Sequence, residues 1–274
     1  MITIPCVAPV KLFQFQLSLF QFQHQKVYGA EAKNKCLIPI VKQNHHNDPL
    51  INSIDWDIKL PYVMVDSIFT HIDEKAHVFC ASNVFYAAKQ LLPYLKDDDI
   101  VEIQDCDIFH LKPYTGPLPG DKEVIVNTFY ENWHMHIATP ESENSHVIRP
   151  YMNHQEEWYP NGGFNTIVKV STLKEIIDDV IEFSVKVGRD NLNTPHAWWM
   201  QMYGLNIACH NNQIKMISMD NCYFPNMNQL DISNHHQAHY SCDPIFHKHQ
   251  FPNLNVIDFP DNVFYNSIRE WMYR

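Results

Sequence analysis

Glycine is scarce in this sequence. Its 274 residues include only seven glycines, and none of them forms a G-x-G-x-x-G, G-x-x-x-x-G-K or G-x-S-x-G pattern. These patterns mark the phosphate loop of dinucleotide-binding proteins, the P-loop and the nucleophile elbow of α/β-hydrolases. Their absence argues against all three classes of protein.

Basic residues and long apolar runs are also lacking. The chain has 20 Lys and Arg against 31 Asp and Glu, a net charge of −11. We expect no nucleic-acid partner, because such binding needs a basic surface. No apolar run approaches the ~18 residues that a membrane span requires, and 45% hydrophobic content is enough for a folded core.

The cysteines do not suggest a disulfide framework. Their number, seven, is odd, and no C-x-x-C pair occurs. The early apolar run 12–22 is interrupted by glutamines, and it lacks the basic start and the small-residue cleavage site of a signal peptide. Reduced thiols and no leader predict a cytoplasmic protein.

Apolar periodicity predicts alternating strands and helices. This order is typical of an α/β fold with a mostly parallel central sheet flanked by helices. Asn83, and either Ser171 or Thr172, are expected to cap helices. We expect one domain over residues 1–274, with strands at 2–10, 35–41, 62–65, 100–103 and 124–129 and helices at 12–27, 83–95, 173–187 and 195–209.

An acidic pair follows one of the predicted strands. The sequence has three Asp-x-Asp patterns, but only Asp105-Cys106-Asp107 lies at the carboxyl end of a buried strand, where open α/β sheets bind ligands. In extended geometry the two carboxylates would point to the same side. Two adjacent carboxylates favour a cation between them, and hard oxygen ligands suit Mg²⁺ or Mn²⁺.

Two further segments are candidates for ligand contacts. Gly162 and Gly163 stand side by side, which allows a ligand to approach the backbone or simply makes a tight turn, and Asn161 could offer its amide to sugar hydroxyls. The segment 197–205 reads as a mostly buried amphipathic helix rich in Trp and Met, more typical of core than of a cofactor site.

Seventeen histidines are too many to be ligands together. The densest cluster, residues 235–249, fits no zinc motif, but one of its histidines could complete a site begun by the two aspartates. We expect His110, His134 and His136 to be partly buried or solvated.

The order of these features resembles a GT-A-fold glycosyltransferase. More narrowly, the chain looks like the hydroxyproline O-arabinosyltransferase and peptidyl-serine galactosyltransferase group, including its short viral and bacterial relatives. Three stretches carry the resemblance: residues 103–109 as the D-x-D segment, 199–203 as an aromatic-Met-Tyr helix, and His239-Tyr240 as a late His-Tyr pair. The chain departs from the group at Cys106, and we expect no secretory or membrane anchor before the domain.

The resemblance implies a metal-dependent hexosyl- or pentosyltransferase that uses a nucleotide-diphosphate sugar, UDP-linked by our guess, and acts in the cytosol on a glycan, peptide or small-molecule acceptor. Residues 1–110 would bind the nucleotide sugar, and residues 111–274 would bind the acceptor and supply a C-terminal metal-binding loop. Mn²⁺ (or Mg²⁺) would be held by Asp105, Asp107 and His239, with His247 as the substitute.

The remaining candidate residues follow from the same resemblance. The donor would contact Asp105 and the Asn-Gly-Gly turn, Lys248 or Arg269 would neutralise the leaving diphosphate, and an inverting mechanism needs a base near the acceptor. Besides Asp107, candidates for catalysis are Glu156, Glu157 and His196. Candidates for nucleoside binding are Pro9, Ser82 and Asn83.

Three alternatives remain open. A nucleotidyltransferase shares the sheet and the metal chemistry, but residues 8–12 lack the glycine-rich basic loop expected there. A carbohydrate-binding protein without turnover could stack sugars on Trp158, Tyr159, Trp198 or Trp199. A zinc protein could use the histidines of residues 235–249.

Overall fold

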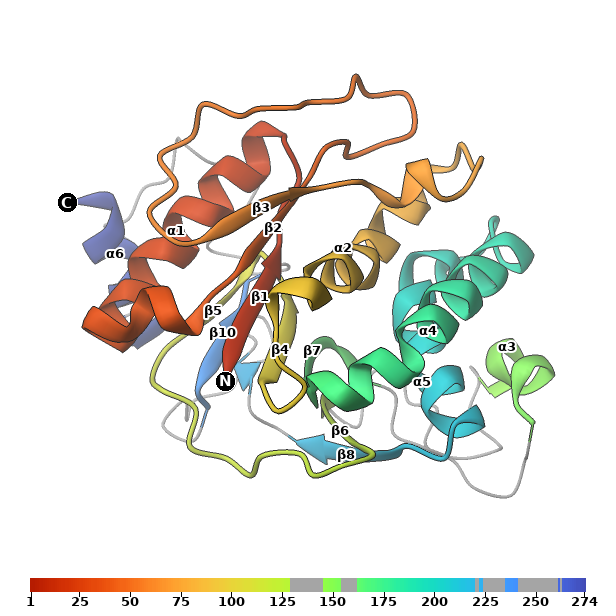
Figure 1. The fold of residues 1–274 in the computed structure, drawn as a ribbon. Helices are drawn as coiled ribbons and strands as arrows, with labels where there is room; N and C mark the ends of the chain where they lie inside the picture. Colours follow the sequence, from red (N-terminus) through yellow and green to blue (C-terminus); the bar gives the residue numbers. More distant parts are fainter. Residues whose placement is uncertain (129–144, 154–161, 220–221, 224–234, 241–260, 262) are drawn as a thin grey trace.

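A five-stranded sheet forms the centre of the computed structural model, which describes residues 1–128, 145–153, 162–219, 222–223, 235–240, 261 and 263–274 (Figure 1). Its strand order is β1-β4-β7-β6-β8. Four strands run in one direction and β7 runs in the other. The predicted α/β fold with a mostly parallel central sheet is confirmed. The strands are β1 (Ile2–Cys6), β4 (Ile100–Asp105), β7 (Gly162–Lys169), β6 (Glu123–Thr128) and β8 (Lys215–Met219).

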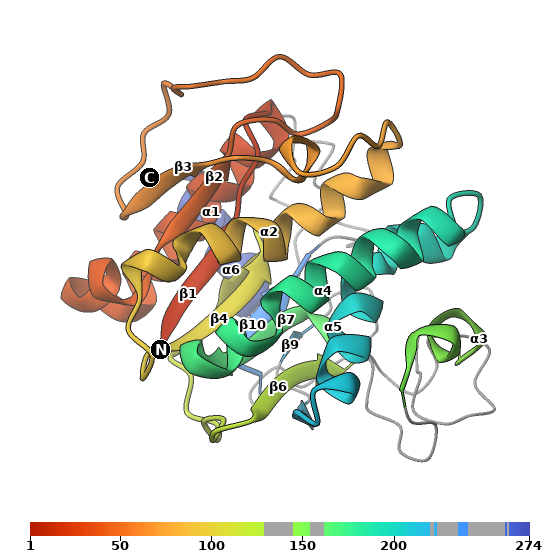
Figure 2. The ribbon, with the colours of Figure 1, turned by 45° about the vertical axis from the view of Figure 1, so that its right-hand side comes forward.

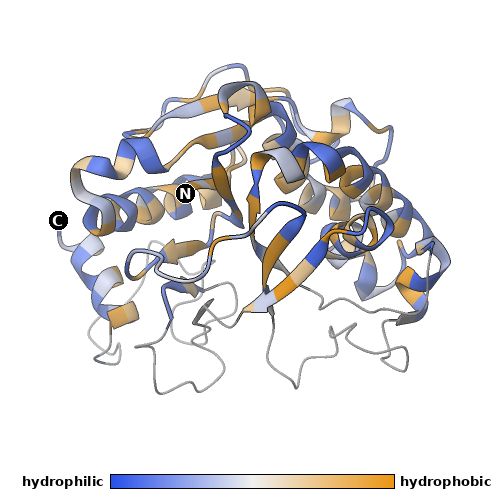
Figure 3. Ribbon diagram, turned by 60° about the horizontal axis from the view of Figure 1, so that its bottom comes forward, coloured by the Kyte–Doolittle hydropathy of each residue, from blue (hydrophilic) through white to orange (hydrophobic). Residues whose placement is uncertain are grey.

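Helices cover both faces of this sheet, as Figures 1 and 2 show. On one face, α2 (Asn83–Leu91), α4 (Val170–Asp190) and α5 (Met200–Asn211) pack on the apolar side of β1 and β4 and form the larger core. On the other side, α1 (Lys11–Tyr28) and α6 (Val263–Met272) enclose a second core together with residues of the two smaller sheets. Figure 3 shows bands of hydrophobic residues along these helices and along the strands. None of the helices in the described part of the chain is long and apolar enough to cross a membrane.

Two smaller sheets complete the fold. β2 (Ile38–Val41) and β3 (Tyr62–Val65) are parallel, and single bridges from Thr3 to Cys36 and from Val7 to Ile40 attach them beside β1. β10 (Gln237–His239) lies between β5 (Ile108–His110), to which it is antiparallel, and β9 (Cys222–Tyr223), to which it is parallel. This three-stranded sheet packs beside α1 in the second core.

Several predicted boundaries are wrong, while the helix at 12–27 and the strand at 62–65 match α1 and β3. The first strand ends at Cys6, and β2 begins only at Ile38 because Gly29–Lys35 forms a 3₁₀ helix. The predicted helix at 195–209 is a 3₁₀ helix, Pro195–Trp199, followed by α5, which is buried on all sides between Met200 and His210 rather than amphipathic. The shorter helices are 3₁₀ helices Ile68–Thr70, His77–Ser82, Leu92–Tyr94 and Arg149–Tyr151, and α3 (Ser145–Ile148).

The predicted helix caps are also wrong. Asn83 is the first residue of α2, and its Oδ1 accepts a hydrogen bond from the Ile68 backbone N–H (2.6 Å) instead of from its own helix. α4 begins at Val170, so Ser171 and Thr172 lie inside it. Thr172 Oγ1 accepts from the Lys122 N–H (3.2 Å), which means that a tertiary contact uses the capping group.

Candidate active site

Asp105 and Asp107 lie where β4 passes into β5. Asp105 is the last residue of β4 and pairs with Cys6 at the end of the parallel strand β1. Cys106 and Asp107 form a turn, and β5 begins at the next residue. The extended geometry expected across Asp105-Cys106-Asp107 is therefore wrong, and a turn brings the two carboxylates together.

His239 joins this pair from a distant part of the chain. It is the last residue of β10 and lies opposite Ile108 in the antiparallel ladder, beside Asp107. The His239 Nε2 is 3.2 Å from Asp107 Oδ1, and both side chains are buried. One ligand atom each from Asp105, Asp107 and His239 lies within 4.8 Å of the others. We call these three residues the acidic cluster.

The groups around the acidic cluster are neutral at physiological pH. Burial, and then the charge of Asp107, raises the pKa of the Cys106 thiol and that of the Tyr240 phenol. Burial, and then the charge of Asp105, raises the pKa of Cys6. None of these three groups therefore brings a positive charge to the acidic cluster.

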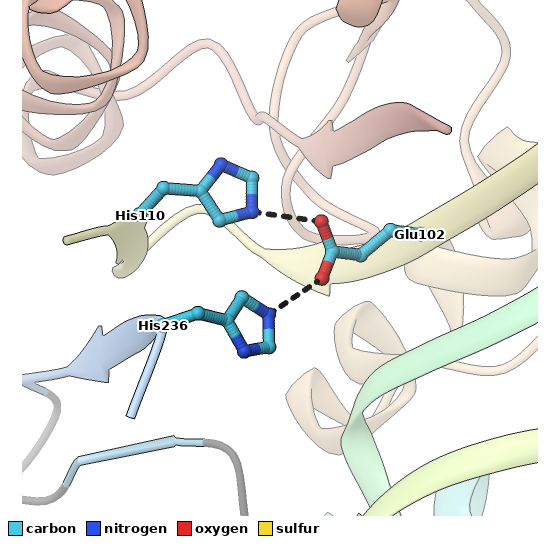
Figure 4. Close-up of side chains that lie close together, drawn as sticks. All are labelled: Glu102, His110 and His236. Carbon is cyan, nitrogen blue, oxygen red and sulfur yellow. Dashed lines mark hydrogen bonds and ion pairs between the residues drawn. The ribbon is translucent and has the colours of Figure 1, made fainter. Parts of the chain in front are cut away.

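A second buried group, drawn in Figure 4, lies deeper along the same strands. Glu102 of β4 is fully buried, its Oε2 is 2.8 Å from His110 Nε2 and its Oε1 is 3.5 Å from His236 Nε2. The Glu102 carboxylate also accepts hydrogen bonds from Thr3 Oγ1 (3.2 Å), Asn165 Nδ2 (3.0 Å) and Gln237 Nε2 (2.8 Å). We call this group the Glu102 network.

Burial alone would raise the pKa of Glu102, but its contacts with His110 and His236 outweigh burial and lower it. Glu102 is therefore an anion inside the protein. The network was missed from the sequence, and His110 is fully buried rather than partly buried or solvated as expected. A signal was available, because Glu102 and Gln104 put two polar side chains on one face of a strand whose other face is apolar.

The structure places other predicted residues as follows. Gly162 and Gly163 open β7 instead of making a tight turn, and because β7 is antiparallel to β4 they lie at the edge where β4 ends. Pro9 lies between β1 and α1, and Ser82 is buried at the end of a 3₁₀ helix. The Asn83 side chain is engaged by the Ile68 amide, as described above.

His196 belongs to a separate group of side chains. Its Nδ1 is 3.0 Å from the Tyr203 hydroxyl, and its ring packs against those of Trp199 and His146. Burial, and then His146, lowers the pKa of His196, so its ring is neutral near pH 7. Arg269 is part of α6, where it donates to Asn266 Oδ1 (2.6 Å). Outside the described residues lie His134, His136, Glu156, Glu157, Trp158, Tyr159, Asn161, His247 and Lys248.

The chain matches the model of a known protein family. The model of the hydroxyproline O-arabinosyltransferase family N-terminal domain matches residues 8–218, more than half of the chain. The matched segment includes Asp105 and Asp107 and ends before His239. A comparison with curated proteins finds no match. The family match nevertheless covers most of the sheet and both aspartates, and the chain therefore belongs to the hydroxyproline O-arabinosyltransferase family.

Proposed function

We propose that this glycosyltransferase is metal-dependent and transfers a sugar from a nucleotide-diphosphate donor. Membership of the family makes the protein a glycosyltransferase. The observation that carries the finer proposal is the acidic cluster, in which Asp105, Asp107 and His239 meet at the carboxyl end of β4. That edge is where α/β sheets of this kind bind ligands. The mostly parallel sheet between two layers of helices is compatible with the GT-A-like fold that we propose for the chain.

The residues of the acidic cluster fit a divalent cation. Two carboxylates and an imidazole offer oxygen and nitrogen ligands, and their mutual distances within 4.8 Å allow one ion to contact all three. The cluster holds two carboxylates within 4.8 Å of each other in a largely buried position, an arrangement that a bound cation would stabilise. Mn²⁺ accepts both ligand types, and Mg²⁺ is the alternative where oxygen ligands dominate.

Each residue of the cluster would have a distinct task. A cation bound there would supply Lewis-acid stabilisation of the charge that develops on the leaving diphosphate. Asp105 and Asp107 would let an acidic protein hold an anionic donor by retaining that cation. The His239 Nε2 lies 3.2 Å from Asp107 Oδ1, so the ring already faces the cluster. His247 and Lys248 keep the roles proposed from the sequence, as alternative ligand and diphosphate partner.

The same edge of the sheet, at the carboxyl ends of β1 and β4, suggests where the donor and the acceptor would bind. We infer that residues 1–110 bind a UDP-linked donor over the carboxyl ends of β1 and β4, close to Pro9, with the backbone of Gly162 and Gly163 opposite. The acceptor would lie against residues 111–274. For an inverting reaction His196 is the described candidate for the base, because its lowered pKa leaves a neutral ring to accept a proton.

Calorimetry with UDP, GDP and other nucleoside diphosphates, each with Mn²⁺, tests the proposal. We expect one of them to bind the wild-type protein, and Asp105→Ala or Asp107→Ala to abolish that binding. The matched control is Asp55→Ala combined with Asp57→Ala, which removes another Asp-x-Asp pair that is exposed at the surface. The proposal fails if no nucleoside diphosphate binds, or if the cluster variants bind as the control does.

Turnover separates an enzyme from a sugar-binding protein of the same fold. We expect slow Mn²⁺-dependent hydrolysis of the nucleotide sugar whose diphosphate binds, because water can replace a missing acceptor. Asp107→Asn should abolish this hydrolysis. Binding without any hydrolysis would instead favour a non-catalytic carbohydrate-binding protein.

A further inference from the structure

The acidic cluster is assembled from two different sheets. Asp105 belongs to β4, which pairs with β1 and β7, whereas His239 belongs to β10, which pairs with β5 and β9. Asp107 lies in the turn between the two sheets. The spacing of the three side chains therefore depends on how firmly the β5–β10 pair is held against β4.

The Glu102 network connects β4 to the β5–β10 pair at a second place. Glu102 lies three residues before Asp105, His110 lies three residues after Asp107, and His236 lies three residues before His239. At about 3.3 Å per residue, the network is about 10 Å along the strands from the acidic cluster. Figure 4 shows His110, the last residue of β5, and His236, which precedes β10, reaching the Glu102 carboxylate.

Gln237 makes the attachment of β10 stronger. Its Nε2 donates to Glu102 Oε1 (2.8 Å) and to Gln104 Oε1 (2.8 Å). Its Oε1 accepts a hydrogen bond from Asn165 of β7. All of these side chains are buried, so their hydrogen bonds compete little with water.

Glu102, His110 and His236 also have the composition of a metal site, but two observations favour a hydrogen-bonded network. Besides the two histidines, the Glu102 carboxylate accepts hydrogen bonds from three other groups, Thr3 Oγ1, Asn165 Nδ2 and Gln237 Nε2, which leave little of it to bind an ion. His110 Nδ1 is buried and has no hydrogen-bond partner among the described residues. Histidines that bind metals usually donate that second nitrogen to an outer partner.

We propose that Glu102 is a positioning residue for the acidic cluster. Through His110, His236 and Gln237 it holds β5 and β10 against β4, and it thereby sets the spacing between Asp105, Asp107 and His239. This role rests on the proposed function in one respect, namely that the acidic cluster binds the cation.

The test uses Glu102→Gln, which keeps the shape of the side chain and removes its charge. Ser184→Ala is the control, because it removes another buried polar group, one that donates to Val180 O (2.6 Å) within α4. The first measurement is amide hydrogen exchange without metal. The reporters are the N–H of Leu111, bonded to His236 O, and that of Tyr240, bonded to Asp107 O.

We compare the exchange rates at Leu111 and Tyr240 with those of amides in the β6–β7 pair, and call the quotient the exchange ratio. This ratio should rise at least tenfold in Glu102→Gln, and Ser184→Ala should leave it unchanged. The second measurement is the Mn²⁺ dissociation constant, which should rise at least tenfold in Glu102→Gln and stay unchanged in Ser184→Ala. Where Glu102→Gln does not fold, Gln237→Met removes the bridge from β10 without changing any charge, and the same results are expected.

An unchanged exchange ratio, or equal acceleration at all amides, overturns the positioning role. Stoichiometric zinc in the purified wild-type protein that is lost in Glu102→Gln also overturns it, because the network would then be a metal site. If the wild-type protein binds no Mn²⁺, the metal-dependent function fails, while hydrogen exchange alone still decides whether Glu102 holds the strands.

Discussion

Replacing Asp105 with Asn removes one of two carboxylates from the acidic cluster and tests its electrostatics directly. The ligand atoms of Asp105 and Asp107 lie within 4.8 Å of each other. Two unit charges at that distance repel by about 3.5 kcal/mol at an effective dielectric constant of about 20. Asp105 is only partly buried, so water screens some of this repulsion. We expect metal-free Asp105→Asn to be more stable than the wild-type protein by about 1 kcal/mol.

The same variant should lose its stabilisation by metal. At a Mn²⁺ concentration 100 times its dissociation constant, binding stabilises the wild-type protein by about 2.7 kcal/mol. An unfolding entropy of about 2.1 cal/mol/K per residue then converts this energy to a rise of about 5 °C in Tm for a chain of this length.

Thermal unfolding with and without Mn²⁺ measures both effects. Asp105→Asn should show no rise in Tm at the same Mn²⁺ concentration, and the surface control Asp55→Asn should behave as the wild-type protein. If Asp105→Asn is less stable without metal and still gains about 5 °C with Mn²⁺, the reasoning about the acidic cluster is refuted.

Three further predictions concern the fold. Burial, assisted by His110, lowers the pKa of His24 to about 3. The unfolded chain therefore takes up a proton below about pH 6.5 that the folded protein does not. Between pH 6 and 4, the unfolding free energy of the wild-type protein should fall by about 1.4 kcal/mol per pH unit more than that of His24→Gln. Denaturant titrations at several pH values that give the same pH dependence for both proteins would contradict this. Gly204→Ala should lower the unfolding free energy of the protein by about 3 kcal/mol, because the added Cβ would lie 2.5 Å from a backbone carbonyl of α4. The control Gly120→Ala, in a loop, should have little effect on the denaturation midpoint. Asn83→Ala should lower the unfolding free energy by about 1–3 kcal/mol, because a buried backbone N–H loses its acceptor; an unchanged value would show that another group replaces it.

Local patterns in the sequence predicted three strands of the central sheet, β1, β4 and β6, and four helices, α1, α2, α4 and α5, but they missed β7, β8 and α6. The sequence pattern predicted α1 and β3 almost to the residue, because each is a continuous apolar-rich segment bounded by polar residues or prolines. Caps were less predictable, since Asn83 and Thr172 have good capping side chains that tertiary contacts use instead. A single-sequence reading has no access to such long-range competition.

The candidate site was predictable where residues of a metal-binding type stand directly after a predicted buried strand. The choice of Asp105 and Asp107 over the other Asp-x-Asp pairs rested on their place after a buried strand, and β4 does end there. That His239 lies beside them depends on the β5–β10 pairing, for which the sequence has only the resemblance as a guide. Glu102 was overlooked because a carboxylate inside an apolar strand becomes interpretable only when its partners are known.

The central claim is that Asp105, Asp107 and His239 bind the cation that holds the donor diphosphate. A crystal structure of the protein with UDP and Mn²⁺, with anomalous scattering recorded at the manganese edge, tests it most directly. We predict one strong anomalous peak in contact with both carboxylates, His239 Nε2 and the diphosphate. Manganese bound elsewhere, or a diphosphate held without contact to this cluster, would contradict the account.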